Sequence, residues 1–321
     1  MEDLGRVDMI LVTGGLGFLG GRIAVKLLES GKMVRIATSK SNPTVPAELL
    51  GCELVTIDLL DEASLVLACK GVTTIIHLAA ANARESEDDF EYALQINGLG
   101  TLKLLNAAKI CSVSKFIYFS TIHVYGAPLF GLIDETRAPK PQSSYAITHR
   151  LAEDYVLSFD QSNILDGVVL RLANVVGLPL TNKNNGWKLA VNDFCRQALL
   201  QKKILLNSNG LQQRNFVAVS DVLEIVAILV DSSFKNFKEA IFNVGGETST
   251  ISEVADSIAK ECNLLFGYMP AIEKGDLKEL ESNFEFVCDR VKVLGYSVSP
   301  LTNEIKQVLV NCNKMLFNSD V

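Results

Sequence analysis

Residues 8–31, DMILVTGGLGFLGGRIAVKLLESG, join a short apolar run to a helical pattern through closely spaced glycines. The apolar spacing after the glycines predicts a helix that ends at Gly31. Gly14, Gly17 and Gly20 stand where a backbone can turn tightly and approach a pyrophosphate at the positive N-terminus of a helix. A purely structural glycine turn is the alternative. The position at a first strand–helix junction favours the phosphate-binding loop.

The rest of the chain repeats this alternation of strands and helices. Further strands are expected at 33–38, 53–58, 73–80, 115–120 and 167–172, and helices at 61–70, 88–111 and 144–160. Such alternation predicts a parallel sheet covered on both faces. After about residue 173 the pattern changes to a loop, a helix at 187–201, a strand at 203–207, a strand running into a helix at 214–230, a strand at 240–246 and a further helix. We therefore expect one domain at 1–173 plus about 214–243, and a smaller lobe at about 174–213 and 244–321.

Composition narrows the class of protein and its partners. Hydrophobic residues make up 48% and charged residues 21%, as in globular proteins, and the net charge of −7 argues against nucleic acid or an anionic membrane as a partner. The longest apolar runs are far shorter than the ~18–20 residues of a membrane span, and the acidic start is unlike a secretory signal. The seven scattered cysteines lack metal-ligand spacing. They predict reduced thiols, no metal site and a cytoplasmic protein.

Several motifs occur in a recognisable series: TGGLGFLG (13–20), IIHLAA (75–80), INGLGTLKLL (96–105), FSTIHVYG (119–126), SSYAITH (143–149), RLANVVG (171–177), QRNFVAVSDV (213–222) and FNVGG (242–246). The series resembles the extended short-chain dehydrogenase/reductase family of NAD(P)-dependent sugar-nucleotide epimerases, dehydratases and reductases. The resemblance implies a Rossmann-type, doubly wound α/β sheet with a smaller C-terminal α/β lobe that binds a nucleotide sugar. It also implies a homodimer paired through the helices at 88–111 and 144–160, although their apolar faces would equally fit simple packing on the sheet.

The resemblance further implies which residues bind NAD or NADP. The expected cofactor residues are Gly14, Gly15, Gly17, Phe18, Leu19, Gly20, Thr38, Ser39, Lys40, Asp58, Leu59, Leu78, Ala79, Ala80, Asn97, Tyr145 and His149. An acidic residue ending the second strand would bind the adenosine ribose of NAD, but Thr38 stands there. Ser39 and Lys40, with Arg35 as a further candidate, could meet a 2′-phosphate, which slightly favours NADP. Lys40 as an ordinary solvated loop residue is the alternative.

By the same resemblance, Tyr145 is the catalytic base and Thr121 hydrogen-bonds the same substrate oxygen. A free tyrosine has a pKa of about 10, so a phenolate needs stabilisation, and a cation ~4–5 Å away would supply roughly 3–4 kcal/mol. The family places a lysine four residues after the tyrosine, and here His149 stands in its place. With a reference pKa of ~6.5, a histidine is mostly neutral above pH 7. His149 therefore predicts a slower or more pH-sensitive enzyme, a reaction that needs no strong phenolate, or a silent binding subunit.

The two residues that directly follow Thr121 indicate which reaction is expected. Family dehydratases carry an Asp-Glu pair directly after it, whereas this chain has Ile122 and His123, so a 4,6-dehydratase is not expected. His123 is either an acid/base beside the sugar or a loop histidine bonded to backbone. We therefore expect hydride transfer at a sugar carbon, with an epimerase as the leading interpretation. A keto-sugar-nucleotide reductase and a catalytically impaired subunit are the alternatives.

The resemblance also implies substrate residues in the second half of the chain. Thr121 and Asn174 would contact the sugar or its diphosphate, and Arg214 would grip the diphosphate as a bidentate donor. A surface ion pair is the alternative for Arg214. Arg171 could pair with a carboxylate inside the fold, and Trp187, the single tryptophan, is expected to be a core or lobe-interface residue rather than a stacking platform for the base.

Overall fold

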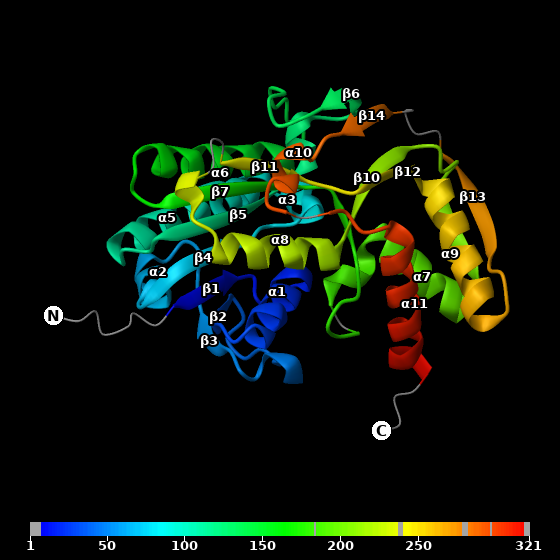
Figure 1. The fold of residues 1–321 in the computed structure, drawn as a ribbon, viewed down its shortest axis with the longest axis horizontal. Helices are drawn as coiled ribbons and strands as arrows, with labels where there is room; N and C mark the ends of the chain where they lie inside the picture. The colour runs from blue at the N-terminus through cyan, green and yellow to red at the C-terminus, as the bar shows by residue number, and fades with distance from the viewer. Residues whose placement is uncertain (1–7, 183, 237–239, 278–281, 296, 318–321) are drawn as a thin grey trace. The chain divides into compact units, whose positions relative to one another are not determined.

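Seven strands form the main sheet in the order β11-β7-β5-β4-β1-β2-β3 (Figure 1). They are β1 (Met9–Thr13), β2 (Met33–Thr38), β3 (Glu53–Thr56), β4 (Val72–His77), β5 (Lys115–Thr121), β7 (Asp166–Leu172) and β11 (Ile241–Val244). The pairs β1–β2, β1–β4, β2–β3 and β4–β5 are parallel. The strand order reverses between β1 and β4, and in such sheets ligands bind outside the carboxyl ends of the strands at that point.

The protein is described by a computed structural model that covers residues 8–182, 184–236, 240–277, 282–295 and 297–317. Within these ranges, no helix combines the length and the hydrophobicity needed to cross a membrane. All seven cysteines lie in the ranges and carry free thiols, and five of them are buried, as expected for reduced core residues.

Helices cover both faces of the sheet because alternate strand side chains are buried on each. Met9 and Leu11 of β1 join a hydrophobic cluster with residues of α2, α5 and α6, while Ile10 and Val12 are equally buried on the other face. There α1 contacts β1 and β2. The helical elements of this part of the chain are α1 (Phe18–Glu29), η1 (Ala47–Leu49), α2 (Glu62–Cys69), α3 (Ala83–Asp88), α4 (Phe90–Ala93), η2 (Leu94–Leu99), α5 (Gly100–Ile110), η3 (Ile122–Tyr125), α6 (Ser144–Gln161), α8 (Val219–Asp231) and η5 (Phe234–Asn236). The expected Rossmann-type α/β fold is confirmed.

The chain divides into two compact units. The first comprises residues 1–127, 138–171 and 226–242, and the second comprises 128–137, 172–225 and 243–321. Residues 128–137 and 214–225 thus belong to the second unit. The assignment of one domain to the cofactor and the other to the substrate stays a prediction.

The second unit has small sheets of its own and a separate core. A three-stranded sheet has the order β12-β10-β8, and β13–β9 and β14–β6 form parallel pairs. Its core joins Trp187 to residues of three helices, α7, α9 and α11. The elements are β6 (Phe130–Ile133), β8 (Asn174–Val176), η4 (Asn185–Lys188), α7 (Ala190–Gln201), β9 (Lys203–Ser208), β10 (Gln213–Ala218), β12 (Glu247–Thr250), α9 (Ile251–Phe266), β13 (Ala271–Leu277), β14 (Asn283–Phe286), α10 (Asp289–Lys292) and α11 (Leu301–Phe317).

Two expected elements differ in the structure. The strand expected at 73–80 ends at His77, so that Leu78, Ala79 and Ala80 form the loop that follows it. The single helix expected at 88–111 is interrupted. Asp89 caps a new helix by accepting a hydrogen bond from the backbone of Tyr92, and residues 94–99 then widen into a π-helix. Such widened turns are frequent at functional sites.

Candidate active site

The glycine loop between β1 and α1 leaves room for phosphate oxygens because side chains are excluded from it. Gly14 has a φ of +66°, which favours glycine, and a Cβ on Gly20 would come within 2.3 Å of the Gly14 carbonyl oxygen. A Cβ on Gly15 would lie 2.6 Å from the Cβ of Ile36. No side chain caps α1 at its N-cap residue, Gly17. The loop therefore fits a diphosphate bound by backbone N–H groups, with Phe18 and Leu19 opening the helix.

At the end of β2, the residues expected to bind the adenosine half differ in their exposure and in their hydrogen bonds. Thr38 is buried and its hydroxyl accepts a hydrogen bond from the Lys40 backbone, while the side chains of Ser39 and Lys40 are exposed. Arg35 donates to Glu53 and to two backbone carbonyls, which engages its guanidinium elsewhere.

The turn after β3 contains two further residues that are expected to bind the cofactor. Asp58 is exposed and accepts a hydrogen bond from the Leu60 backbone, and Leu59 is buried.

Two buried side chains, those of Thr13 and Asn97, accept hydrogen bonds from the backbone of the loop after β4. Thr13 accepts hydrogen bonds from the backbone N–H groups of Leu78 and Ala79, and Asn97 accepts one from Ala81 at 2.7 Å. The Asn97 amide group also donates to Thr148 on α6. Asn97 therefore fixes the loop that contains Ala80, and its expected contact with the cofactor stays a prediction.

Thr121 and Tyr145 meet at the carboxyl end of β5. Thr121 ends the strand, and Tyr145 lies in the first turn of α6, which Ser143 caps. Burial raises the pKa of Tyr145 to about 12, and the hydrogen bond with the Thr121 side chain opposes this shift. At neutral pH Tyr145 is therefore a phenol whose hydroxyl already meets the threonine, in the arrangement that the sequence predicts.

His149 lies one turn after Tyr145 along α6 and is almost fully buried. The two ring centroids are 4.3 Å apart in an edge-to-face arrangement, and Nδ1 of His149 is 2.7 Å from the Tyr118 hydroxyl. Burial lowers the pKa of His149 to about 3, and charge repulsion from His123 acts in the same direction. His149 is therefore neutral at pH 7. Its Nε2 atom is buried and has no hydrogen-bond partner among the described residues.

His123 follows Thr121 in the short helix η3, and its side chain is exposed. Its ring centroid lies 6.3 Å from that of Tyr145, and its backbone N–H donates to Thr121. Ile122 is buried. His123 is therefore near the tyrosine, and Ile122 has no proton to exchange.

Two turns after Tyr145 along α6, a buried ion pair joins this helix to β7 of the sheet. Glu153 accepts hydrogen bonds from Arg171 through both oxygens, at 3.0 and 2.7 Å, and from Ser120 at 2.5 Å. Arg171 also donates to Tyr125. The prediction that Arg171 pairs with an internal carboxylate is confirmed.

Asn174 and Arg214 lie on neighbouring strands of the second unit. Asn174 pairs in register with Phe216 of β10 and donates to the Asn215 carbonyl, and both Nε and Nη2 of Arg214 donate to Gln212. Within the described ranges, Arg214 forms no ion pair. This disfavours the surface ion-pair interpretation.

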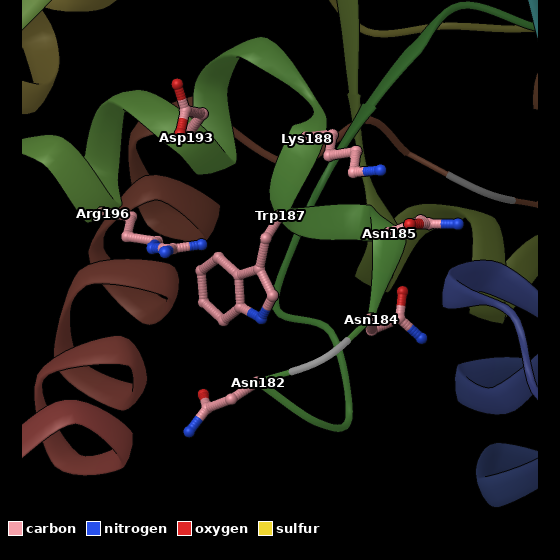
Figure 2. A pocket seen from close by; sticks show the side chains of 7 residues that line it. All are labelled: Asn182, Asn184, Asn185, Trp187, Lys188, Asp193 and Arg196. Carbon is pink, nitrogen blue, oxygen red and sulfur yellow. The ribbon is translucent and has the colours of Figure 1, made fainter.

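A polar hollow of about 420 Å³ lies beside Trp187 in the second unit (Figure 2). The residues that line it are Asn182, Asn184, Asn185, Trp187, Lys188, Asp193 and Arg196. None of them is a predicted site residue. Trp187 itself is buried in the core of this unit and donates from Nε1 to the Thr181 carbonyl, which confirms the core interpretation.

Two residues of the candidate site, Tyr118 and Glu153, were not predicted from the sequence. A tyrosine in a buried strand needs a partner for its hydroxyl, and strand alternation places Tyr118 and Ser120 on one face of β5. Glu153 lies four residues after His149, so helical spacing places both on one face of α6. These two signals together could have identified both residues.

Comparison with known proteins shows the family of the chain and its similarity in fold to solved structures. The sequence model of the NAD dependent epimerase/dehydratase family matches residues 10–245. A UDP-N-acetyl-alpha-D-glucosaminuronate decarboxylase from Bacillus cytotoxicus is 30% identical, covering 77% of this chain and 78% of the relative. A dTDP-D-glucose 4,6-dehydratase from Mus musculus is 28% identical, covering 88% of this chain and 78% of the relative. The crystal structure of Thermus thermophilus UDP-glucose 4-epimerase in complex with NAD superimposes with a TM-score of 0.80 at 27% identity, covering 95% of this chain and 99% of the other. With its glycine loop and its Thr121–Tyr145 pair, the chain belongs to the NAD dependent epimerase/dehydratase family.

Proposed function

We propose that the protein is a nucleotide-sugar epimerase that acts by reversible hydride transfer at a sugar carbon. The observation that carries the proposal is the meeting of the Thr121 and Tyr145 side chains at the carboxyl end of β5, in the unit that contains the glycine loop. Bound NAD(P)⁺ would supply the hydride acceptor. The glycine loop, residues 38–40 and 78–80, and Nε2 of His149 would hold it.

The protein's own residues would move the proton. Tyr145 would take the proton of the sugar hydroxyl as that carbon is oxidised, and Thr121 would hold the same oxygen in place. His149 is neutral, so it would bind a ribose hydroxyl as a hydrogen-bond donor and would not supply a charge. His123 would lie on the sugar side of Tyr145. The absence of an acidic pair at positions 122 and 123 argues against a 4,6-dehydratase.

One observation favours a second candidate, a keto-sugar-nucleotide reductase. With its pKa raised to about 12, Tyr145 is a phenol at neutral pH, which is the form that donates a proton to a carbonyl oxygen. Reduction would use this form directly, whereas oxidation needs the scarce phenolate.

A single-turnover measurement separates these candidates. The protein, loaded with NAD⁺ or with NADP⁺, is mixed in turn with UDP-, GDP-, CDP- and dTDP-sugars at several pH values, and the absorbance of reduced nicotinamide is followed. An epimerase should give a rise with one sugar, and Tyr145→Phe should abolish it. In a second series the protein is loaded with NADH or NADPH, and loss of reduced nicotinamide on adding a keto-sugar nucleotide would identify a reductase instead. A sugar that binds without any absorbance change in either direction would favour a silent subunit. The relative Kd of NAD⁺ and NADP⁺ tests the slight preference for NADP.

Arg214 is proposed to bind the substrate diphosphate. Its guanidinium is oriented by Gln212 alone among the described polar partners. We expect Arg214→Ala to weaken binding of the sugar nucleotide tenfold or more, because charge-assisted bidentate hydrogen bonds are among the strongest in proteins. The Kd of the cofactor should stay unchanged. Isothermal titration calorimetry with each ligand gives both values, and Arg150→Ala is the control for loss of an arginine. An unchanged affinity for the sugar nucleotide would remove this assignment.

We further propose that the protein is a homodimer paired through α4, η2 and α6. Phe90, Leu94, Leu99 and Ile147 are 42–64% exposed although they belong to elements that pack on one another. Ile147→Asp should shift the mass in light scattering from dimer to monomer at micromolar concentration, because it would bury a charge in an apolar interface. Leu67→Asp, at a leucine of α2 that is at least as exposed as Ile147, is the matched control. A monomeric wild type would end the proposal.

A further inference from the structure

Tyr118 makes the contact that decides how His149 can act. It lies on β5, three residues before Thr121, and both its side chain and that of His149 are at least 97% buried. The Tyr118 hydroxyl is 2.7 Å from Nδ1 of His149, and the ring centroids are 5.9 Å apart. Nothing in the proposed chemistry uses Tyr118 directly.

The direction of this hydrogen bond fixes the tautomer of His149. If Tyr118 donates to Nδ1, the proton of His149 is on Nε2, and Nε2–H is the single unsatisfied group of the pair. If Nδ1–H donates instead, the Tyr118 proton has no other acceptor among the described residues, and Nε2 becomes an unpaired acceptor as well. Each buried polar group without a partner costs roughly 1–3 kcal/mol, so the first arrangement is favoured.

The surroundings of the pair agree with a neutral imidazole. Two basic groups from other elements act on the pair: repulsion with His149 helps to lower the pKa of His77 on β4, and repulsion from His123 on η3 helps to lower the pKa of His149. The other titratable groups near the pair, Tyr145 and Glu153, lie on α6, the helix that contains His149. The Glu153 carboxylate is already bonded to Ser120, Arg150 and Arg171. No carboxylate is hydrogen-bonded to His149 within the described chain, so nothing there would hold a second proton on the ring.

We propose that Tyr118 is a positioning residue that donates to Nδ1 of His149 and thereby presents Nε2–H as a fixed donor to a ribose hydroxyl of the nicotinamide cofactor. The cofactor half of the inference rests on the proposed function, whereas the tautomer concerns the protein alone. Tyr118 and His149 together would then replace the binding role of a lysine but not its charge.

The tautomer can be measured directly because the chain has only three histidines, His77, His123 and His149. In ¹⁵N-histidine-labelled, cofactor-free protein, two-bond ¹⁵N–¹H correlations distinguish the Nε2–H from the Nδ1–H form, and a His149→Gln sample assigns the signals. We expect His149 to be in the Nε2–H form at pH 7. His77 is an internal reference, since Thr13 accepts two backbone N–H bonds and so donates to its Nδ1, which leaves Nε2–H for Thr101.

Tyr118→Phe removes only the hydroxyl and should release the tautomer. We expect a mixture of the two forms for His149 and a Kd for the nicotinamide cofactor about three- to tenfold higher, the usual value of one buried hydrogen bond. Tyr125→Phe is the matched control, because it removes a buried phenol hydroxyl that is bonded to Arg171 and not to His149. It should leave the tautomer unchanged.

Each outcome bears on a separate part of the inference. An Nδ1–H form in the wild type, or an unchanged tautomer in Tyr118→Phe, would overturn the role of Tyr118. An altered tautomer with an unchanged cofactor Kd would overturn the ribose contact. If the wild type bound neither NAD⁺ nor NADP⁺, the proposed function and the ribose contact would fail together, while the tautomer result would still decide the role of Tyr118.

Discussion

The His149→Lys variant is expected to oxidise its sugar nucleotide about a hundredfold faster than the wild type at pH 7. Tyr145 has a pKa of about 12 and a neutral neighbour, so very little phenolate is present. An ammonium group ~4–5 Å from the phenolate would stabilise it by roughly 3–4 kcal/mol, which lowers the pKa of Tyr145 by about two to three pH units. A pKa that is lower by at least two units raises the fraction of phenolate at pH 7, and with it the rate of oxidation, about a hundredfold.

The pH profile distinguishes this explanation from a general gain in activity. The wild-type rate of oxidation should rise about tenfold per pH unit from about pH 7 to pH 10, since it follows the phenolate. It should show no inflection near pH 6.5, because the pKa of His149 is about 3. The profile of His149→Lys should level off at about pH 9–10. Stopped-flow absorbance of reduced nicotinamide gives these rates.

Two controls make the result interpretable. Tyr145→Phe, in the wild-type and in the His149→Lys background, should remove the pH-dependent rate in both. His149→Gln keeps a neutral hydrogen-bonding side chain, so its pH profile should have the same slope as that of the wild type. A wild-type rate that falls as pH rises through 6.5 would mean that a protonated His149 supports catalysis, and the neutral-donor explanation would be wrong.

The sequence predicted the part of the fold that depends on local pattern. The apolar run before the glycines and the helix after them became β1 and α1, and the alternation through residue 172 became the parallel sheet. The pairing of β14 with β6 joins segments about 150 residues apart along the chain, and β6 is mostly exposed. No local periodicity marks such a strand, so the sequence analysis did not predict it.

In the candidate site, too, some features follow from the local sequence pattern and others only from three-dimensional packing. The sequence showed His149 four residues after Tyr145, in the place of the family's lysine, but only its reference pKa was available to predict its charge. The charge depends on what surrounds the ring. Tyr118 and His77 approach from neighbouring strands, and only the sheet order brings them to α6. Thr121, Tyr145 and His149 were therefore identified from the sequence, whereas the partner of His149 and its protonation state were not.

The Glu153→Leu variant is expected to lose about 3–5 kcal/mol of unfolding free energy. It would leave Arg171, which is 1% exposed, charged and without its carboxylate inside the fold. Burial disfavours the charged form of Arg171, and the hydrogen bonds and charge of Glu153 more than compensate, so its pKa is raised on balance. Urea denaturation followed by circular dichroism gives the change in midpoint.

Asp154→Ala is the matched control because Asp154 is the next residue on α6 and also pairs with Arg150, but it is more than half exposed. That change should cost less than about 1 kcal/mol. The double variant Glu153→Leu/Arg171→Met should be more stable than Glu153→Leu alone, because no buried charge then lacks a partner. The single variant Arg171→Met completes the double-mutant cycle. If Glu153→Leu were as stable as Asp154→Ala, or if the double variant lost the sum of the losses of Glu153→Leu and Arg171→Met, the ion pair would not be what anchors α6. The position of Tyr145 at the start of that helix would then depend on apolar packing alone.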